Sequence, residues 1–154
     1  MKAVIQRVRS ARVQVDGRTV GECGHGLLVL LGVAPGDTDR DLERMVQKMV
    51  KLRIFEDENG KMNRSLLDVG GEVLVISQFT LLADYRKGNR PDFFGAAAPD
   101  TAKTLYEDFI DLLREQVSHV ACGKFGANMQ VSLCNDGPVT IVMDSDVLAP
   151  ASNA

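Results

Sequence analysis

The sequence contains few of the residues that usually hold metal ions or form disulfide bonds. It has 154 residues, of which three are cysteines (Cys23, Cys122 and Cys134) and two are histidines (His25 and His119). The cysteines are far apart and form no CxxC pair, so the sequence predicts neither a disulfide framework nor a zinc site. Two histidines are too few for a histidine-rich metal centre. We therefore expect no metal site and no other cofactor.

Long hydrophobic runs are also missing. No apolar run approaches the ~20 residues that a membrane-spanning helix needs. Charged or polar residues interrupt segment 1–15 repeatedly, which is not the pattern of a signal peptide. We therefore expect a cytoplasmic location and no membrane partner. The net charge of −3 argues against a protein that coats nucleic acid nonspecifically, although it allows a local basic surface.

The short motifs of several common enzyme classes are absent as well. The chain has no GxSxG, HExxH, P-loop or GxGxxG sequence, so the usual hydrolase, metalloprotease and nucleotide-binding interpretations lack their residues. A Ser-His-Asp triad is also poorly supported. Any chemical site has to be sought among other polar residues.

What is present is the composition of one globular domain. With 45% hydrophobic and 25% charged residues, a chain of this length can bury on the order of two-thirds of its unfolded surface. We predict a single domain over residues 1–145 and a small, polar C-terminal tail over 146–154, which should fray. No internal repeat or linker is present.

Strand and turn signals dominate the sequence. Asp16-Gly17 and Asn59-Gly60 each stand between β-prone stretches and predict hairpins. Residues Leu27–Val33 are too apolar for a strand with a wet face, so this strand should be central. Apolar residues at helical spacing predict amphipathic helices over Asp39–Leu52 and from Pro99 onward. The expected fold is α+β, with about seven or eight short strands, mostly antiparallel, in a curved sheet or open β-barrel and two amphipathic helices.

Polar residues at the end of an apolar run make one stretch stand out. Val73–Ile76 is typical of a strand covered on both faces, and it leads directly into Ser77, Gln78 and Thr80. A buried polar group costs roughly 1–3 kcal/mol unless it finds a partner, so either the core or a ligand should satisfy these side chains. If the strand continues through Thr80, alternation puts Gln78 and Thr80 on one face and Ser77 with Phe79 on the other. A structural role is the alternative, because threonine is a favoured strand residue.

A basic loop follows this run. Arg86, Lys87 and Arg90 lie in the polar segment 84–91, immediately after the predicted strand. Polar side chains beside such a loop are suited to a polyanionic substrate.

A second unusual segment is NDGPVT, at Asn135–Thr140. By residue type it predicts a hairpin turn between strands Met129–Cys134 and Val139–Met143, because Asp, Gly and Pro each favour turns. Pro138 at the start of a strand fits that interpretation.

Together, the two segments resemble those of the D-aminoacyl-tRNA deacylases. The resemblance rests on SQFTL at Ser77–Leu81 and NxGPVT at Asn135–Thr140, and it covers residues 1–144 through the opening KAVIQRV and the KGNRP loop. Members of that family are homodimers that hydrolyse the ester linking a D-amino acid to the 3′ end of tRNA, without a metal. The resemblance therefore implies chiral proofreading in translation, with tRNA as the partner. Asp92 departs from the family pattern, in which serine is common at this position.

The resemblance also implies a role for individual residues. Ser77, Gln78 and Thr80 would line the pocket for the aminoacyl-adenosine. Phe79 would form a wall for the adenine. The tRNA itself would bind the basic residues of the loop, Arg86, Lys87 and Arg90.

The second motif would complete the site from the other subunit. Gly137 and Pro138, joined by a cis peptide, would enter the pocket of the partner subunit, and Arg7 would hold this Gly-Pro loop in place. Gly137 and Pro138 would select D-aminoacyl substrates. Glycyl-tRNA would also be accepted, because glycine has no Cβ.

Two alternatives to this function remain. A noncatalytic nucleic-acid-binding dimer would use the same basic loop and need no reactive centre. A free-standing esterase for small acyl esters is disfavoured, because nothing resembles an activated serine. Within the deacylase interpretation, a threonine hydroxyl without a basic partner is a poor nucleophile, so we expect Thr80 to position the substrate. Backbone N–H groups near Phe79 and Thr80 would polarise the ester carbonyl, and the ribose 2′-OH would help to activate water.

Overall fold

Strand β1 organises the sheet, because three other strands pair with it. The computed structural model describes residues 1–148 of the chain. Within it, β1 (Lys2–Val15) pairs antiparallel with β2 (Arg18–Cys23), β3 (Gly26–Gly32) and β8 (Gln130–Asp144). The predicted hairpin at Asp16-Gly17 joins β1 to β2, and both turn residues have positive φ, as two-residue hairpin turns require.

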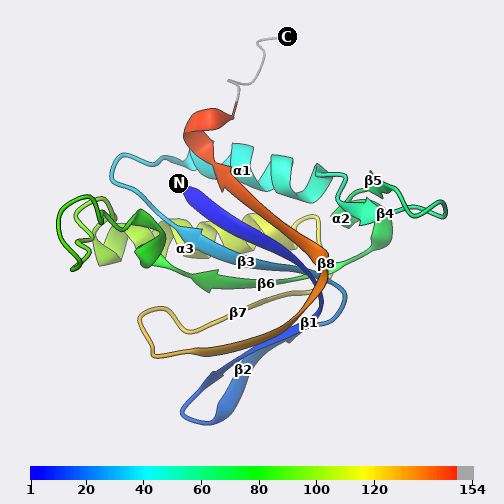
Figure 1. Cartoon of the computed structure of the whole chain (residues 1–154), viewed down its shortest axis with the longest axis horizontal. Helices are drawn as coiled ribbons and strands as arrows, with labels where there is room; N and C mark the ends of the chain where they lie inside the picture. Colours follow the sequence, from blue (N-terminus) through cyan, green and yellow to red (C-terminus); the bar gives the residue numbers. More distant parts are fainter. Residues whose placement is uncertain (149–154) are drawn as a thin grey trace.

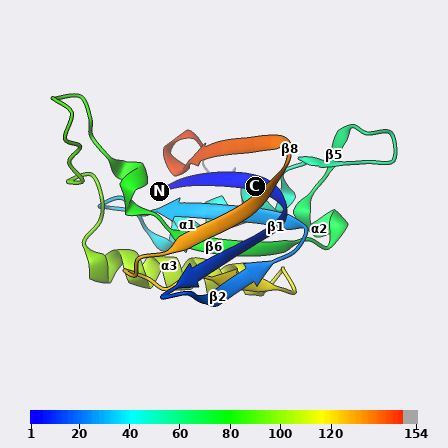
Figure 2. The same ribbon diagram turned by 60° about the horizontal axis from the view of Figure 1, so that its bottom comes forward.

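The other half of the sheet is parallel. Strand β6 (Glu72–Ser77) pairs parallel with β3, and β7 (Val120–Cys122) pairs parallel with β6. The strand order is β2-β1-β3-β6-β7. Strand β8 also pairs with β1 but is not part of this linear order. Figure 1 and Figure 2 show that the sheet curls and that β8 lies across β1. The curled sheet forms an open, barrel-like surface. The expected α+β fold with a curved, mostly antiparallel sheet is confirmed.

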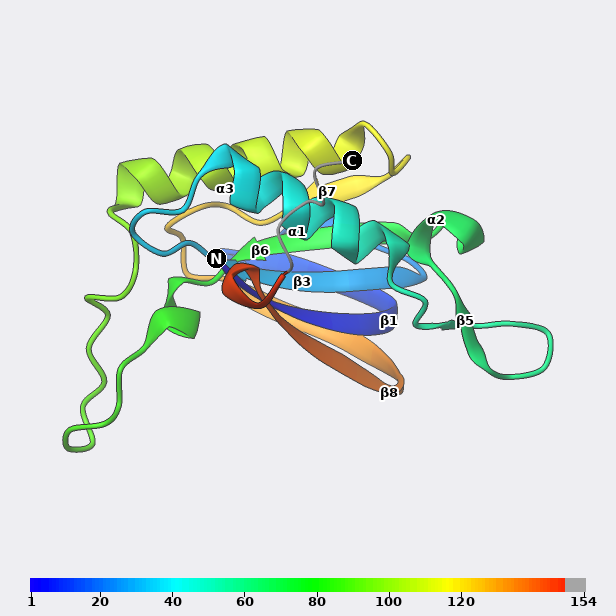
Figure 3. The ribbon, with the colours of Figure 1, turned by 90° about the horizontal axis from the view of Figure 1, so that it is seen from above.

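The central strand β3 is buried on both faces, as its apolar sequence predicts. Leu27, Val29 and Leu31 belong to the main core, beneath helices α1 (Asp39–Lys51) and α3 (Pro99–Arg114). Leu28 instead points into a second, smaller core on the inner side of the curved sheet. Figure 3 shows the two helices together on one face of the sheet. This two-sided burial explains why the strand has no polar residues.

The two predicted amphipathic helices begin where the sequence indicates. The Thr38 backbone N–H donates to the Asp41 carboxylate at 2.9 Å and so caps α1, and Pro99 occupies the first turn of α3. A short helix, α2 (Leu66–Val69), was not predicted, although Ser65 and Asp68 form a capping box around it. The predicted hairpin at Asn59-Gly60 joins β4 (Phe55–Glu56) to β5 (Met62–Arg64).

The prediction of a hairpin turn at Asn135–Pro138 is wrong. Strand β8 runs continuously through this segment, and both of its halves pair with β1. The pairing loses register between Gln6, which faces Thr140, and Val8, which faces Asn135. The segment therefore bulges out of a continuous strand because the long β1 holds both ends of β8 in one sheet.

The C-terminal region is described only in part. Ser145–Val147 form a short 3₁₀ helix, η2, whose Ser145 is buried and accepts a hydrogen bond at 2.9 Å from the terminal ammonium of Met1. Residues 149–154, most of the expected tail, lie outside the described residues. Within residues 1–148, every helix is too short or too polar to span a membrane.

Candidate active site

The first motif lies where β6 ends, at the carboxyl end of the parallel strands. The strand stops at Ser77, and the Gln78 backbone N–H donates to the Leu31 carbonyl at 2.8 Å. The chain then turns into the 3₁₀ helix η1 (Phe79–Leu82), which packs across the end of β3. Gly32 permits this, because a Cβ there would lie 2.5 Å from the Leu82 side chain.

The expectation that the strand continues to Thr80 is therefore wrong, and so is the alternation drawn from it. Phe79 and Thr80 are exposed residues of η1, and Gln78 is half-buried before it. The turn still brings Gln78 and Thr80 together, since the Gln78 side-chain amide donates to the Thr80 hydroxyl. The neighbouring amides of Phe79 and Thr80 donate no hydrogen bond among residues 1–148, as is usual for the first N–H groups of a helix.

A pocket of about 780 Å³ opens beside this turn. Ser77, Gln78 and Phe79 contribute to its wall, whereas Thr80 does not. The remaining wall is mainly apolar and comes from β3 and from the segments before α3 and β8, including Leu31, Phe93, Phe94, Ala97, Phe125 and Met129. Phe79 packs edge-on against Phe93, with ring centroids 5.1 Å apart.

Sequence reasoning missed the rest of this pocket wall. The segments 93–99 and 125–129 contribute aromatic and small residues without any polar motif. The only feature of these segments in the sequence is a change to small residues, as in the run Gly95–Ala98. Small residues let backbone segments pack closely, but they do not indicate a chemical role.

The second motif lies elsewhere on the same chain. Gly137 and Pro138 are exposed in the bulge of β8, and the peptide bond between them is cis, as expected. They are supported by Arg7 on β1. Arg7 pairs with Leu27 of β3, whereas Ser77 of β6 pairs with Leu31, four residues further along β3. Four strand residues span about 13 Å, so one chain does not bring its own Gly-Pro bulge to its own pocket.

Arg7 is a buried cation that contacts the start of this bulge. Its side chain donates to the Asp136 carbonyl at 3.1 Å and to the Ile54 carbonyl at 2.7 Å. The Asp136 carboxylate lies 3.4 Å from the same guanidinium. A Cβ on Gly137 would lie only 2.8 Å from the Arg7 Nη2 atom, so the guanidinium packs directly against this glycine.

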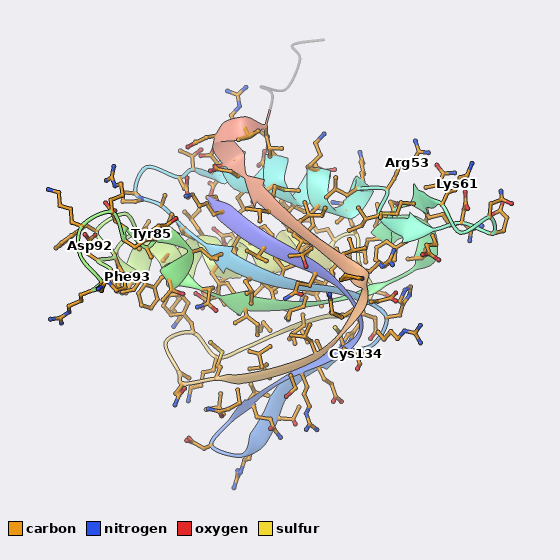
Figure 4. All side chains as sticks on the ribbon, viewed as in Figure 1. Arg53, Lys61, Tyr85, Asp92, Phe93 and Cys134 are labelled. Atoms are coloured by element: carbon orange, nitrogen blue, oxygen red, sulfur yellow. The ribbon has the colours of Figure 1, made fainter. Side chains whose placement is uncertain are left out.

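The basic loop is closed at its base by two aspartates. Asp84 and Asp92 exchange two backbone hydrogen bonds, of 2.9 and 3.0 Å. Figure 4 shows Tyr85, Asp92 and Phe93 together at this end of the molecule. Asp92 therefore takes part in closing the loop through its backbone.

The three basic residues of this loop are not equivalent. Arg86 forms a two-point pair with the Asp84 carboxylate, at 2.9 and 2.6 Å, and this pairing lowers the pKa of Asp84 to about 2. Lys87 and Arg90 are exposed and form no ion pair within residues 1–148. The side chains most available to a phosphate are therefore those of Lys87 and Arg90.

The part of the chain that the structure describes contains no cluster of three or more histidine, cysteine, aspartate or glutamate side chains that could hold a metal ion. The polar groups at the pocket are instead the Ser77 hydroxyl, the carboxamides of Gln78 and Asn128, and backbone amides. Such groups can orient a neutral ester and stabilise a developing oxyanion.

Known proteins identify the family of this chain. A family model described as D-Tyr-tRNA(Tyr) deacylase matches residues 4–144. The D-aminoacyl-tRNA deacylase of Thermosipho africanus (strain TCF52B) is 56% identical over 145 residues, covering 94% of this chain and 97% of its own length. That of Desulfatibacillum aliphaticivorans is 58% identical over 145 residues, covering 94% of this chain and 99% of its own length.

Two solved structures share the fold. The "c-Myc DNA Unwinding Element Binding Protein" is 45% identical, with a TM-score of 0.89 over 98% of this chain and all of its own. A "probable eukaryotic D-amino acid tRNA deacylase" is 19% identical, with a TM-score of 0.80 over 92% of this chain and 97% of its own, which supports the fold alone. From the family model and the close relatives, the chain belongs to the D-Tyr-tRNA(Tyr) deacylase family.

Proposed function

We propose that this protein hydrolyses the ester between a D-amino acid and the 3′-terminal adenosine of tRNA, as a proofreading step in cytoplasmic translation. Its family membership supports this activity. The observation that carries the proposal is the pocket of about 780 Å³ beside the free amides of η1, next to a loop with exposed cations. Its size is suited to a small molecule such as an aminoacyl-adenosine.

The reaction needs an oriented ester and a stabilised oxyanion. Water adds to the ester carbonyl carbon, the bond to the ribose 3′ oxygen breaks, and that oxygen takes up a proton. The N–H groups of Phe79 and Thr80 stabilise the negative charge that develops on the carbonyl oxygen. The Thr80 hydroxyl accepts a hydrogen bond from Gln78, and among residues 1–148 no basic side chain bonds to it, so Thr80 does not attack the ester but holds the Gln78 side chain, which lines the pocket. The ribose 2′-OH of the substrate helps to activate the water.

The protein acts as a homodimer in which Gly137 and Pro138 enter the pocket of the partner subunit. Support comes from the exposure of both residues and from their separation from Ser77, about 13 Å along the sheet of one chain. Their backbone carbonyls bind the ammonium group of the substrate. A D side chain then points to solvent, whereas an L side chain collides with the backbone. Glycine has no Cβ to collide, so glycyl-tRNA is also hydrolysed.

The test is hydrolysis by the purified protein of tRNAs charged with D-tyrosine, L-tyrosine and glycine. We expect release of D-tyrosine and of glycine, no acceleration for the L-tyrosyl ester, and the same rates with EDTA. Failure to release D-tyrosine would contradict the activity. Rapid cleavage of the L-tyrosyl ester would contradict the chiral selection alone.

A noncatalytic nucleic-acid-binding dimer is the second candidate. It is favoured by one observation, the name of the 45% identical solved structure, which describes binding to a DNA unwinding element. The same assay separates the two candidates, because a pure binding protein would retain a single-stranded DNA probe but leave D-Tyr-tRNA intact.

A further inference from the structure

The pocket is bordered by aromatic side chains that the proposed reaction does not require. Phe94 is 90% exposed and Tyr85 is 77% exposed, the former at the wall of the pocket and the latter at the base of the basic loop. Large aromatic rings exposed in this way usually mark an interaction surface. Phe79 is accounted for differently, because its ring packs on Phe93 and is the wall that the family resemblance implies for the adenine.

Backbone contacts fix the segment that presents these rings. The reciprocal hydrogen bonds of Asp84 and Asp92 lie directly before Tyr85 and directly before Phe93. The Asp92 carboxylate also accepts a hydrogen bond from the Phe94 N–H at 3.3 Å. Shortly afterwards the Ala97 N–H donates to the Val33 carbonyl, just beyond the end of β3, at 2.9 Å. Phe94 is therefore presented by an anchored backbone and not by a free loop.

Cations without acidic partners accompany the exposed rings. Lys87 and Arg90 belong to the loop that Asp84 and Asp92 close, and they form no ion pair within residues 1–148. Exposed aromatic rings beside unpaired cations are the usual arrangement for binding single-stranded nucleic acid, in which bases stack and phosphates are neutralised. A protein partner with an apolar surface would not explain the adjacent positive charges.

We propose that Phe94, assisted by Tyr85, stacks on the nucleotides that precede the terminal adenosine of tRNA, while Lys87 and Arg90 bind their phosphates. This inference rests on the proposed function, since it assumes that the terminal adenosine occupies the pocket. The single-stranded 3′ end then leaves the pocket past Phe94 and follows the loop. The surface extends recognition from the ester to the tRNA and holds the substrate without reading its sequence.

The test compares two substrates that differ only in the nucleotides beyond the adenosine. One is D-Tyr-tRNA and the other is adenosine carrying a 3′-O-D-tyrosyl ester. The variants are Phe94→Ala, Phe94→Trp and, as a matched control, Met62→Ala, which removes an exposed apolar side chain from β5. Lys61, the neighbour of Met62, lies at the opposite end of the molecule from Tyr85 and Phe93 (Figure 4).

For Phe94→Ala we expect KM for D-Tyr-tRNA to rise about tenfold, which is the effect of removing one stacked base. Because Phe94 also forms part of the pocket wall, KM for D-tyrosyl-adenosine should rise as well but much less, so the decisive quantity is the ratio of the two KM values, which should increase several-fold. Phe94→Trp should restore binding of the tRNA substrate because its ring stacks as well, and Met62→Ala should change neither substrate.

Three results would overturn the inference. Equal kinetics of Phe94→Ala and the unmodified protein on D-Tyr-tRNA would show that the ring stacks on no base. An equal rise in KM for both substrates would assign Phe94 to the adenosine pocket. A shift of Phe94→Ala to a smaller species in sedimentation would assign the ring to a subunit interface. If the unmodified protein hydrolyses neither substrate, the proposed function itself fails, which is distinct from all three results.

Discussion

Arg7 and Asp136 connect two parts of the chain that are 129 residues apart in sequence, through a hydrogen bond of 3.1 Å from the Arg7 Nε atom to the Asp136 carbonyl. The same side chain, which is only 5% exposed, donates to the Ile54 carbonyl. The residue directly before Gly137 is thus fixed from inside the protein, and the exposed Gly-Pro bulge has a rigid base.

Arg7→Met should destabilise the protein and weaken catalysis together. The substitution leaves the carbonyls of Asp136 and Ile54 and the Asp136 carboxylate without their cation. The free energy of unfolding, measured with urea, should therefore fall by roughly 3 kcal/mol. Turnover of D-Tyr-tRNA should fall at least tenfold under conditions where the variant stays folded. Arg9→Met is the matched control, because Arg9 is exposed and also approaches Asp136, at 3.6 Å. Its effect on stability should stay below about 1 kcal/mol, and a similar destabilisation in both variants would contradict the special role of Arg7.

Gly137→Ala should damage the site more than the overall stability. The added Cβ would lie 2.8 Å from both Arg7 Nη2 and Val139 Cγ2, at a φ of +129°, so the bulge has to move. We expect D-Tyr-tRNA turnover to fall by at least about tenfold, since small misplacements of positioning groups have effects of this order. Gly60→Ala is the control, because Gly60 also has positive φ but open space around it. Full activity of Gly137→Ala would remove this position from the site.

A mixture of two impaired variants should recover activity if each site uses both subunits. Gly137→Ala keeps an intact pocket, whereas Gln78→Ala keeps an intact Gly-Pro bulge. After unfolding and joint refolding, half of the dimers are mixed and each has one intact site, so activity should return to about a quarter of that of the unmodified protein. The variants refolded separately are the controls. No recovery in a mixture shown to contain mixed dimers would contradict the cross-subunit site.

Thr80→Ala should retain measurable turnover of D-Tyr-tRNA. Its hydroxyl is exposed and accepts a hydrogen bond from Gln78, which orients it without making it a nucleophile. A substrate with a 2′-deoxy terminal adenosine should react much more slowly with the unmodified protein. Mass spectrometry after rapid quenching checks the same point, because a D-tyrosyl adduct on Thr80 would show that the threonine attacks the ester.

The salt dependence of KM should separate the three basic residues of the loop. Replacing Lys87 or Arg90 with alanine should reduce the slope of log KM against log salt by about 0.7 for each phosphate that the protein no longer neutralises. Arg86→Ala should change this slope little, because Asp84 already pairs with Arg86.

Because Asp84 stays ionised, the difference in salt dependence between the Arg86 variant and the Lys87 or Arg90 variants should not change between pH 6 and pH 8. Its pKa is lowered to about 2, mainly by the Arg86 side chain, so the folded state favours the ionised carboxylate. The Asp84–Arg86 pair therefore stabilises the folded state fully above the ordinary aspartate pKa of 3.8, and this stabilisation is lost as the pH falls through about 2. The slopes measured at pH 6 and pH 8 should agree, and Asp84→Asn should make them steeper by releasing Arg86.

The sequence by itself determined the features that depend on local composition. The apolar runs at Leu27–Val33 and Val73–Ile76 required burial on both faces, and Thr38 and Pro99 marked the starts of the two main helices. The residue types of the two polar motifs were sufficient to single them out and to indicate the family.

Only the tertiary structure decided how these pieces meet. Nothing local shows that β8 continues through Asn135–Pro138, because it does so by pairing with the distant strand β1. Likewise β6 ends at Ser77 because η1 packs over Gly32, which is remote in sequence. The wall that Phe93 and Phe94 give to the pocket has no motif of its own. Patterns of hydrophobicity record whether a residue is buried, but the partner it meets depends on pairing between distant segments, and that pairing is established only when the whole sheet forms.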